Sequence, residues 1–310
     1  MNRNKAVKHL FIVNPAAGNR NRTREICQKI NSLNFSGGYA VEITARPGEA
    51  GSIAESYACR SQEELRIYAC GGDGTLYEVV NGVFKYKHCS VGPIPIGSGN
   101  DFIRGFEEYN ASDFLDIQRM IRGESRAIDT IDVNGHISIN VTSVGFDAHV
   151  NRRMTSVKKL PVVGGGNAYK LSCALSIIDK MKHSFIPVVD GNPIIGEGPY
   201  LLAAIGNKQY YGGGFKVTPL AVDDDGLLDF VRIPHVSRLF FSRFVAKFRR
   251  GEHIALDEVR FTRCKSVQFL SEKPLVVNVD GETFILHNPS MRVVPKSLKI
   301  ILPEKTELRC

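Results

Sequence analysis

The sequence has few cysteines and no long apolar run, and each shortage excludes a class of protein. The 310 residues include only seven cysteines, an odd number without any C-x-x-C pair. This pattern favours reduced thiols in a cytoplasmic protein over a disulfide framework or a zinc site. The longest apolar run near the N-terminus is Leu10 to Val13, which Asn14 and Pro15 end. We therefore expect neither a signal peptide nor a membrane-spanning helix, because both need longer apolar segments.

Several catalytic motifs are also missing. The eight histidines form no H-E-x-x-H, and neither a Walker A loop nor a G-x-S-x-G elbow occurs, so zinc hydrolase and serine hydrolase chemistry have no support. Lys and Arg number 40 against 32 Asp and Glu, a net charge of +8. This charge favours anionic partners, which include nucleic acid, phosphorylated small molecules and an acidic lipid surface. The basic residues are dispersed without an aromatic-basic RNA motif, so we expect no nucleic acid partner.

The composition and length indicate a globular chain of two domains, with 43% hydrophobic and 23% charged residues. Up to about residue 125, apolar strand-like runs alternate with amphipathic stretches, which predicts an α/β domain with a mostly parallel sheet. The expected strands are 9–13, 39–44, 65–70 and 91–96, and the expected helices are 21–33, 50–60, 75–84 and 112–122.

Closely spaced strands follow from about residue 127, which predicts a second, mainly antiparallel domain. We place the domains at 1–127 and 128–310, with the last strand or strands returning to the first domain. The expected strands are 127–133, 136–143, 186–189, 200–206, 227–233, 259–262, 266–270, 275–279, 284–287, 291–294 and 298–302. Helices are expected at 168–181 and 237–250. The second has an apolar stripe and a basic back, a pattern more typical of a helix packed on a core than of one docked on a membrane.

The motif Gly71-Gly72-Asp73-Gly74-Thr75 lies directly after a strand and before a helix. Its glycines let the backbone turn sharply and approach a ligand, while Asp73 adds a carboxylate for a metal ion or a hydroxyl. Thr75 and Glu78 form a capping-box pattern, which predicts that the helix begins at Leu76. A helix N-terminus at such a loop is an anion site, so the motif favours phosphate binding over a plain turn.

Two further loops follow strands of the same sheet. They are Asn14-Pro15-Ala16-Ala17-Gly18 and Pro95-Ile96-Gly97-Ser98-Gly99-Asn100-Asp101. Each alone is weak evidence, because an ordinary turn has similar residues. The carboxyl ends of parallel strands share one edge, where ligands of open α/β sheets bind, so we expect the three loops to converge there.

Two acidic turns lie in the second half of the chain. Asp280-Gly281-Glu282 is a typical hairpin turn, and its two carboxylates are also candidates for the base in phosphoryl transfer. The segment from Val222 to Leu227 contains three consecutive aspartates. It is too short for an EF-hand, so a hard-cation site and a solvated turn remain equal alternatives.

Together these motifs resemble the bacterial lipid kinases that share the diacylglycerol kinase catalytic domain, relatives of the sphingosine kinases. The resemblance covers nearly the whole chain. It implies an α/β nucleotide-binding domain of the NAD kinase and diacylglycerol kinase type, a C-terminal β-sandwich-like domain, and a cleft between them for Mg-ATP and the lipid headgroup. The implied ATP contacts are Asn14, Pro15, Ala16, Ala17, Gly18, Thr44, Gly71, Gly72, Asp73, Gly74, Thr75, Leu76, Tyr77 and Ser98.

The resemblance also implies a role for the acidic turns. Glu282 matches the proton acceptor, with Asp280 beside it, and Asp73 is the third candidate catalytic residue. A structural metal site would use the Asp225 carboxylate with the carbonyls of Val222 and Leu227. The sequence departs from the family at Tyr77, where relatives often have asparagine, and at Ser98, where they often have threonine.

The expected activity is ATP- and Mg²⁺-dependent phosphorylation of a hydroxyl of diacylglycerol or a related lipid alcohol, in phospholipid metabolism. The expected location is cytoplasmic, with peripheral attachment to the membrane that holds the lipid. Two alternatives stay open: an NAD kinase, and a non-catalytic nucleotide-binding module. The oligomeric state is also open, with a homodimer as one alternative, and the sequence does not identify the lipid.

Overall fold

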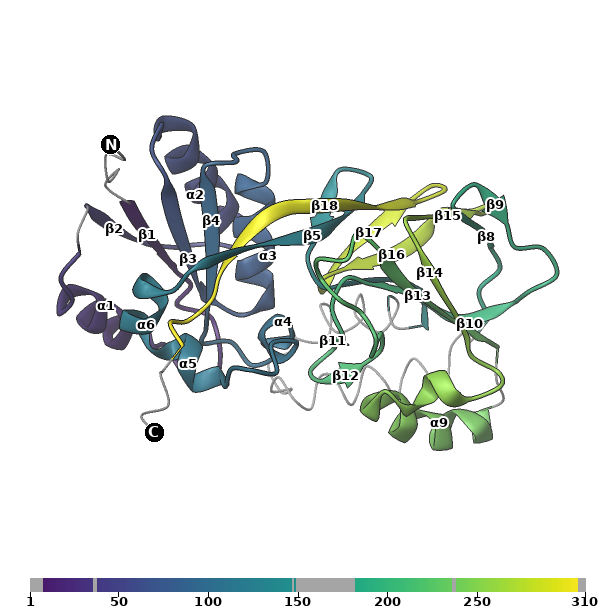
Figure 1. Ribbon diagram of the computed structural model, residues 1–310. Coiled ribbons are helices and arrows are strands. Elements are labelled where there is room, and N and C mark those ends of the chain that lie inside the picture. The colour runs from purple at the N-terminus through teal and green to yellow at the C-terminus, as the bar shows by residue number, and fades with distance from the viewer. Residues whose placement is uncertain (1–7, 36–37, 147, 149–181, 236–237, 306–310) are drawn as a thin grey trace. The chain divides into compact units, whose positions relative to one another are not determined.

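The chain folds into two units (Figure 1). Our computed structural model describes residues 8–35, 38–146, 148, 182–235 and 238–305, without the side chains of 238–243. Unit 1 takes its described residues from 1–129 and 295–310, and unit 2 from 130–294. The helix expected at 168–181 lies outside the described residues.

Unit 1 is built on a parallel sheet with the strand order β2-β1-β3-β4. Its strands are β1 (Lys8–Val13), β2 (Tyr39–Ile43), β3 (Leu65–Gly71) and β4 (Cys89–Pro95). Strands β1, β3 and β4 are buried along almost their whole length, as expected where helices cover both faces of a parallel sheet. The predicted α/β domain with a mostly parallel sheet is confirmed.

The helices of unit 1 follow the strands in turn. They are α1 (Thr23–Asn31), α2 (Glu49–Arg60), α3 (Asp73–Val83), α4 (Asp101–Arg104), α5 (Ala111–Leu115) and α6 (Ile117–Arg122). The single helix expected at 112–122 is wrong, because Asp116 divides it. Asp116 leaves the helical conformation with φ −80° and ψ 97°, and its carboxylate then caps α6 by accepting the Arg119 N–H at 3.2 Å.

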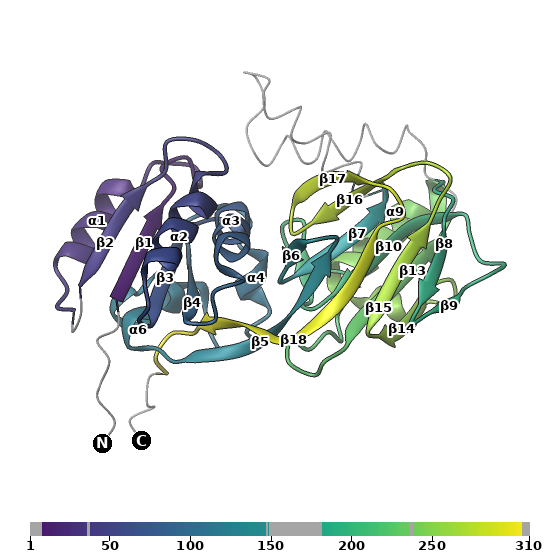
Figure 2. The same cartoon turned by 90° about the horizontal axis from the view of Figure 1, so that it is seen from above.

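Unit 2 contains a six-stranded antiparallel sheet and a second group of strands (Figure 2). The sheet order is β14 (Arg260–Cys264), β13 (Leu228–Pro234), β10 (Tyr200–Gly206), β7 (Val141–Gly145), β16 (Leu275–Val279) and β17 (Glu282–Leu286). The second group consists of β6 (His136–Ser138), β8 (Ile186–Val189), β9 (Asn192–Pro193), β15 (Ser266–Leu270) and the unit 2 parts of β5 (Ser125–Val133) and β18 (Ser290–Ile301), two strands that cross the boundary between the units. Smaller elements are β11 (Tyr210–Tyr211), β12 (Phe215–Lys216), helix α9 (Arg238–Arg250) and the 3₁₀ turn η1 (Glu252–Ala255).

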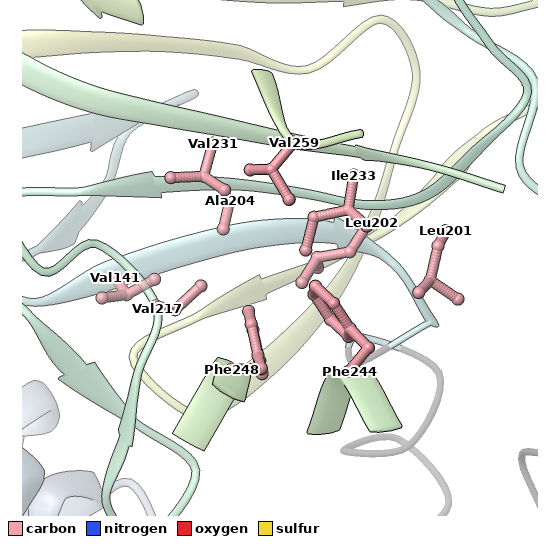
Figure 3. Close-up of a cluster of buried hydrophobic side chains, with 10 residues drawn as sticks. All are labelled: Val141, Leu201, Leu202, Ala204, Val217, Val231, Ile233, Phe244, Phe248 and Val259. Carbon is pink, nitrogen blue, oxygen red and sulfur yellow. The ribbon is translucent and has the colours of Figure 1, made fainter. Parts of the chain in front are cut away.

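The six-stranded sheet is covered on both faces. Phe230 of β13 meets Phe269 of β15 with ring centroids 5.9 Å apart, which joins the two groups of strands into a sandwich. The next residue, Val231, belongs to a core cluster with Phe244 and Phe248 of α9 (Figure 3). This alternation follows from the two-residue period of a strand. The expected core role of the apolar stripe is confirmed for these two phenylalanines, which are 3% and 7% exposed.

Two strand predictions in the second half are wrong. The strand expected at 136–143 is broken into β6 and β7, because the N–H groups of Ile139 and Asn140 bind the Asp280 carboxylate. The strands expected at 291–294 and 298–302 form one strand, β18. It pairs with β15 near its start and with β4 through Ile300, so β18 contributes to the strands of both units.

Candidate active site

Three glycine-containing loops meet at the carboxyl edge of the unit 1 sheet. Residues 14–18 follow β1, residues 71–75 include the end of β3, and residues 96–101 follow β4. Strand β1 pairs with β2 on one side and β3 on the other, so the chain reverses its direction of travel across the sheet there. Ligands of open α/β sheets bind at such switch points. The predicted convergence of the three loops is confirmed.

Hydrogen bonds join these loops to one another. The Asn14 side chain donates from Nδ2 to the Thr75 hydroxyl at 3.0 Å, and its Oδ1 accepts the Ala16 N–H at 3.0 Å. The Gly97 N–H donates to the Gly71 carbonyl at 3.1 Å. Each loop is therefore held by a neighbour on the same edge, which orders the site before a ligand arrives.

The glycines permit this close packing. A Cβ on Gly97 would lie 2.3 Å from the Cα of Gly72, and a Cβ on Gly18 would lie 2.4 Å from the Ile96 carbonyl oxygen. Real Cβ atoms do not approach other atoms so closely, so larger residues would force the loops apart.

The predicted capping box of α3 is wrong. The helix begins at Asp73, and the Glu78 carboxylate accepts the N–H groups of Gly48 at 2.7 Å and Ala50 at 3.1 Å instead. Glu78 thus holds the start of α2, while the Thr75 hydroxyl is bound to Asn14. The first turn of α3 lies within the loop, so its positive dipole end is at the partly exposed Gly72 to Gly74 segment.

Asp73 joins the second loop to the third. Its Oδ1 accepts the Phe102 N–H at 3.4 Å at the start of α4. Burial raises the pKa of Asp73, and hydrogen bonds from the backbone of residues 100–102 oppose that rise. Asn100 has a left-handed backbone with φ 54°, and its side chain donates to the Gly97 carbonyl at 2.8 Å. Helix α4 was not predicted, although Asn-Asp before an apolar pair is a helix-start signal.

The residues proposed as ATP contacts differ in exposure. A ligand has access to Asn14, Pro15, Ala16, Gly18, Gly72, Asp73, Gly74 and Ser98, all of which are at least partly exposed. Buried positions are Ala17, Thr44, Gly71, Thr75, Leu76 and Tyr77. Tyr77 is 8% exposed on α3. The buried group can shape the loops, whereas direct contact is open to the exposed group.

Two pockets are associated with the unit 1 sheet. The smaller lies among the loops and is lined by Gly71, Gly72, Asp73, Leu76, Asn100 and Phe102 with neighbouring residues. The larger, of about 330 Å³, lies at the opposite end of β1 and is lined by Lys8, His9, Tyr39, Tyr57 and Arg60 among others. The loop edge, unlike the lining of the larger pocket, has a helix N-terminus, which favours phosphates.

In unit 2, Asp280 and Gly281 form the hairpin turn between β16 and β17, with φ values of 49° and 99°. The expected turn is confirmed. The Asp280 carboxylate accepts hydrogen bonds from the Ser138 hydroxyl and from the N–H groups of Ile139, Asn140 and Val141, at 2.7 to 3.1 Å. Burial raises its pKa to about 6 against these hydrogen bonds.

Glu282 has a different environment from Asp280. It begins β17 opposite Val279, and it is exposed. The Asp280 carboxylate is therefore bound to backbone amides, whereas the Glu282 carboxylate is accessible from solvent.

The role of Asp280 recurs in other turns of unit 2. Asp190 has φ 47°, and its carboxylate accepts the N–H groups of Lys265 and Ser266. Asn134 and Asn288, also at positive φ, accept the N–H groups of Ser290 and Ser271. Asp280 is thus one of several turn residues in this unit whose side chains accept N–H groups from a neighbouring segment. These contacts were not predicted, because the partners are remote in sequence.

The expected metal turn is also in unit 2. Asp225 accepts the Leu227 N–H at 3.0 Å, and its second oxygen lies 3.4 Å from Arg263. Val222 is 45% exposed. Within the part of the chain that the structure describes, no three His, Cys, Asp or Glu residues gather at a point where they could hold a metal ion. In the same part, no helix is long and apolar enough to cross a membrane.

Comparison with known proteins places both halves of the chain. Residues 8–133 match the diacylglycerol kinase catalytic domain, and residues 140–302 match the YegS C-terminal NAD kinase beta sandwich-like domain. A diacylglycerol kinase from Staphylococcus carnosus is 30% identical over 88% of this chain and 87% of its own, and one from Bacillus subtilis is 28% identical over 88% of each.

A crystal structure of a diacylglycerol kinase from Bacillus anthracis has a similar fold. It superposes with a TM-score of 0.68 at 18% identity, covering 96% of this chain and 98% of its own. The family matches span both halves of the chain, and the relatives cover nearly all of it. The chain therefore belongs to the lipid kinase family that carries the diacylglycerol kinase catalytic domain, and it is a kinase.

Proposed function

We propose that this kinase transfers the γ-phosphate of ATP, with Mg²⁺, to the hydroxyl of diacylglycerol or a related lipid alcohol. The observation that carries the proposal is the convergence of three loops on the N-terminus of α3, in a chain that matches lipid kinases along both halves. An NAD kinase would share the glycine loop, but the relatives that cover most of the chain are named diacylglycerol kinases.

Unit 1 offers its backbone to the phosphates of ATP. The partly exposed segment at 72–74 presents backbone amides without large side chains, and the first turn of α3 adds its dipole. Fixed amides of this kind stabilise the charge that develops on the phosphoryl oxygens without reorganising during the reaction. Ser98 keeps the hydroxyl expected at its position and is exposed.

The acidic residues at the loops suit a nucleotide-bound Mg²⁺ ion. A Cβ on Gly99 would lie 2.8 Å from Oδ2 of Asp73 and 4.0 Å from Oδ2 of Asp101, so both carboxylates lie beside this glycine. Mg²⁺ in kinases is held by one or two carboxylates together with substrate phosphates. We propose that Asp73 holds the ion in this way, because Asp101 is 6% exposed and its Oδ1 already lies 3.3 Å from the Arg104 guanidinium. When bound, the ion neutralises developing negative charge.

We assign the proton acceptor to Glu282 rather than Asp280. The Asp280 oxygens already accept four hydrogen bonds, whereas Glu282 is exposed at the start of β17. Glu282 would take the proton of the lipid hydroxyl. At the same time the hydroxyl oxygen bonds to the γ-phosphorus, and the bond between the γ-phosphorus and the bridging oxygen of the β-phosphate breaks. Asp280 is then a positioning residue, since it fixes the turn that carries Glu282.

The net charge of +8 suits a kinase that meets its substrate at a membrane. Anionic lipid headgroups attract a basic protein surface over roughly one Debye length. We propose that the enzyme is cytoplasmic and reaches its lipid by binding the bilayer peripherally.

An acceptor screen tests this function. Full-length protein with Mg²⁺ and γ-labelled ATP is incubated with detergent-dispersed diacylglycerol, phosphatidylglycerol or a sphingoid base, with NAD⁺, or without acceptor. Label is then measured in the lipid extract and in the aqueous phase, and the products are identified by mass. We expect label in a phosphorylated lipid alcohol. Label in NAD⁺, or ATP binding without transfer to any acceptor, would contradict the proposal.

A further inference from the structure

Two positively charged side chains from other parts of unit 2 reach the acidic turn at 222–227. Lys208 extends from the segment after β10, and its Nζ lies 3.0 Å from Oδ2 of Asp223. The side chains are 5% and 4% exposed. A buried ion pair is screened little by solvent, so loss of either partner leaves a buried charge uncompensated.

Arg263 of β14 makes the second approach. Its Nη1 lies 3.4 Å from Oδ2 of Asp225, its Nε donates to Oδ1 of Asp229 at 3.2 Å, and its Nη2 donates to the Leu220 carbonyl at 3.0 Å. Asp229 is the direct cross-strand partner of Arg263 in the pairing of β13 with β14. One guanidinium therefore binds two carboxylates and a carbonyl around the turn.

These oxygens are the type of ligand that a hard cation uses. Mg²⁺ and Ca²⁺ prefer carboxylate and carbonyl oxygens, and family resemblance implies a metal ion bound to Asp225 and the carbonyls of Val222 and Leu227. In this chain one Asp225 oxygen accepts the Leu227 N–H and the other faces Arg263. A guanidinium that lies 3.4 Å from this oxygen repels a metal ion there. The residues present do not fit a bound metal at this turn.

We propose that Lys208 and Arg263 replace a structural metal ion at the 222–227 turn, so that unit 2 folds without one. The positive charge that pairs with Asp223, Asp225 and Asp229 belongs to the chain itself and cannot be removed by a chelator. This turn is not the site at which we propose that Mg²⁺ binds together with ATP. The inference concerns thermal stability without nucleotide, so it can fail or succeed independently of the proposed kinase function.

The first test compares wild type with Asp225→Asn. Full-length protein treated with EDTA is melted without nucleotide across a Mg²⁺ titration, with NaCl of equal ionic strength as the control. We expect the wild-type Tm to be the same in Mg²⁺ and in the NaCl control. If Mg²⁺ does shift the Tm, we expect the same shift in Asp225→Asn, because the ion then binds away from this turn. A saturable rise that Asp225→Asn abolishes would overturn the proposal.

The second test removes the guanidinium. Arg263→Ala should lower Tm by about 3 to 8 °C, because it leaves Asp225 and Asp229 without their cation. Mg²⁺ should restore part of this loss, since the freed oxygens can now bind it. The matched control is Arg260→Ala on the same strand, because Arg260 is also exposed and donates to the carbonyls of Asp257 and Val259.

Arg263→Lys covers the case in which Arg263→Ala does not fold. This variant keeps the positive charge but not the guanidinium geometry that reaches several acceptors. We therefore expect a smaller fall in Tm than in Arg263→Ala, and a Tm that does not change with Mg²⁺. Two results would contradict the proposal. One is an equal Tm change in Arg263→Ala and Arg260→Ala, and the other is a saturable rise of the Arg263→Lys Tm with Mg²⁺.

Discussion

Glycines serve different purposes at the loops of unit 1 and at the hairpins of unit 2. At the unit 1 loops they allow atoms to come close together, as at Gly97, where a Cβ would lie 2.3 Å from the Cα of Gly72. At the unit 2 hairpins they have open space around them and positive φ, as at Gly281 with φ 99° and nothing within 4 Å of a Cβ. The first kind of glycine builds a surface of bare backbone, and the second only reverses the chain.

This difference extends to the acidic residues beside the glycines. In unit 1 the aspartate of the glycine loop joins the loop after β3 to the loop after β4. In unit 2 the aspartates of the hairpins bind amides of neighbouring strands and leave Glu282 exposed. We therefore propose that unit 1 supplies amides for phosphates, while unit 2 supplies one accessible carboxylate.

The largest expected effect is that of Gly97→Val. The new side chain has no room beside Gly72, so the loops must separate. We expect ATP binding to fall below detection in calorimetry, with a loss of at least about 3 kcal/mol in the free energy of unfolding measured in urea. Normal ATP affinity in this variant would show that the close contact of the loops is unimportant.

Gly135→Ala is the comparison variant in unit 2, at a glycine that has a positive φ and no close neighbour. Gly135 has φ 91° and open space around it, so the expected cost is backbone strain alone, about 1 to 3 kcal/mol of unfolding free energy. ATP affinity should stay at the wild-type value. A change in affinity comparable to that of Gly97→Val would remove the distinction between the two kinds of glycine.

Asp73→Asn tests the aspartate that joins the loops. Loss of the charge weakens hydrogen bonds from the backbone at the start of α4, which should cost about 1.5 to 3 kcal/mol of stability and abolish most activity. Urea melts and kinase assays are compared with Asp257→Asn, an exposed aspartate of unit 2. Wild-type turnover in Asp73→Asn would contradict its assignment.

The stability of unit 2 should depend on pH through Asp280. Its folded pKa of about 6 lies above the value near 4 of an unfolded aspartate. Its contribution to stability is therefore full below about pH 4 and is lost as pH rises through about 6. Across this range we expect the unfolding free energy of wild type to fall relative to that of Asp280→Asn. Parallel pH profiles of the two proteins would show that Asp280 titrates normally.

The smallest effect concerns the membrane surface. The net charge of +8 should favour anionic vesicles over neutral ones at low ionic strength, and salt should weaken the binding. Co-sedimentation with vesicles of both compositions over a range of NaCl concentrations measures this. Equal binding to neutral and acidic vesicles at low salt would mean that the charge does not recruit the enzyme.

Local patterns were enough to predict most of the fold. The strands at 186–189, 200–206, 266–270 and 275–279 have the expected bounds, because alternation and turn residues are properties of adjacent positions. The three loops were predictable for the same reason, since each glycine motif directly follows an apolar strand.

The errors arose where a distant partner outweighs a local pattern. Thr75 and Glu78 look like a capping box, but Asn14, Gly48 and Ala50 bind them instead. Asp280 interrupts the strand expected at 136–143 from a position 140 residues away along the chain. The sequence does not show these partners, so it could not separate the role of Asp280 from that of Glu282.

The most direct test of the account separates ATP binding from turnover in Glu282→Gln. The ATP dissociation constant and kcat with the lipid acceptor are measured for wild type, Glu282→Gln and the control Glu272→Gln, an exposed glutamate of the same unit. We predict that Glu282→Gln keeps the ATP affinity and the thermal stability of wild type and loses about 10²- to 10⁴-fold in kcat. Full turnover in Glu282→Gln, or an equal loss in Glu272→Gln, would contradict the assignment of the base to unit 2.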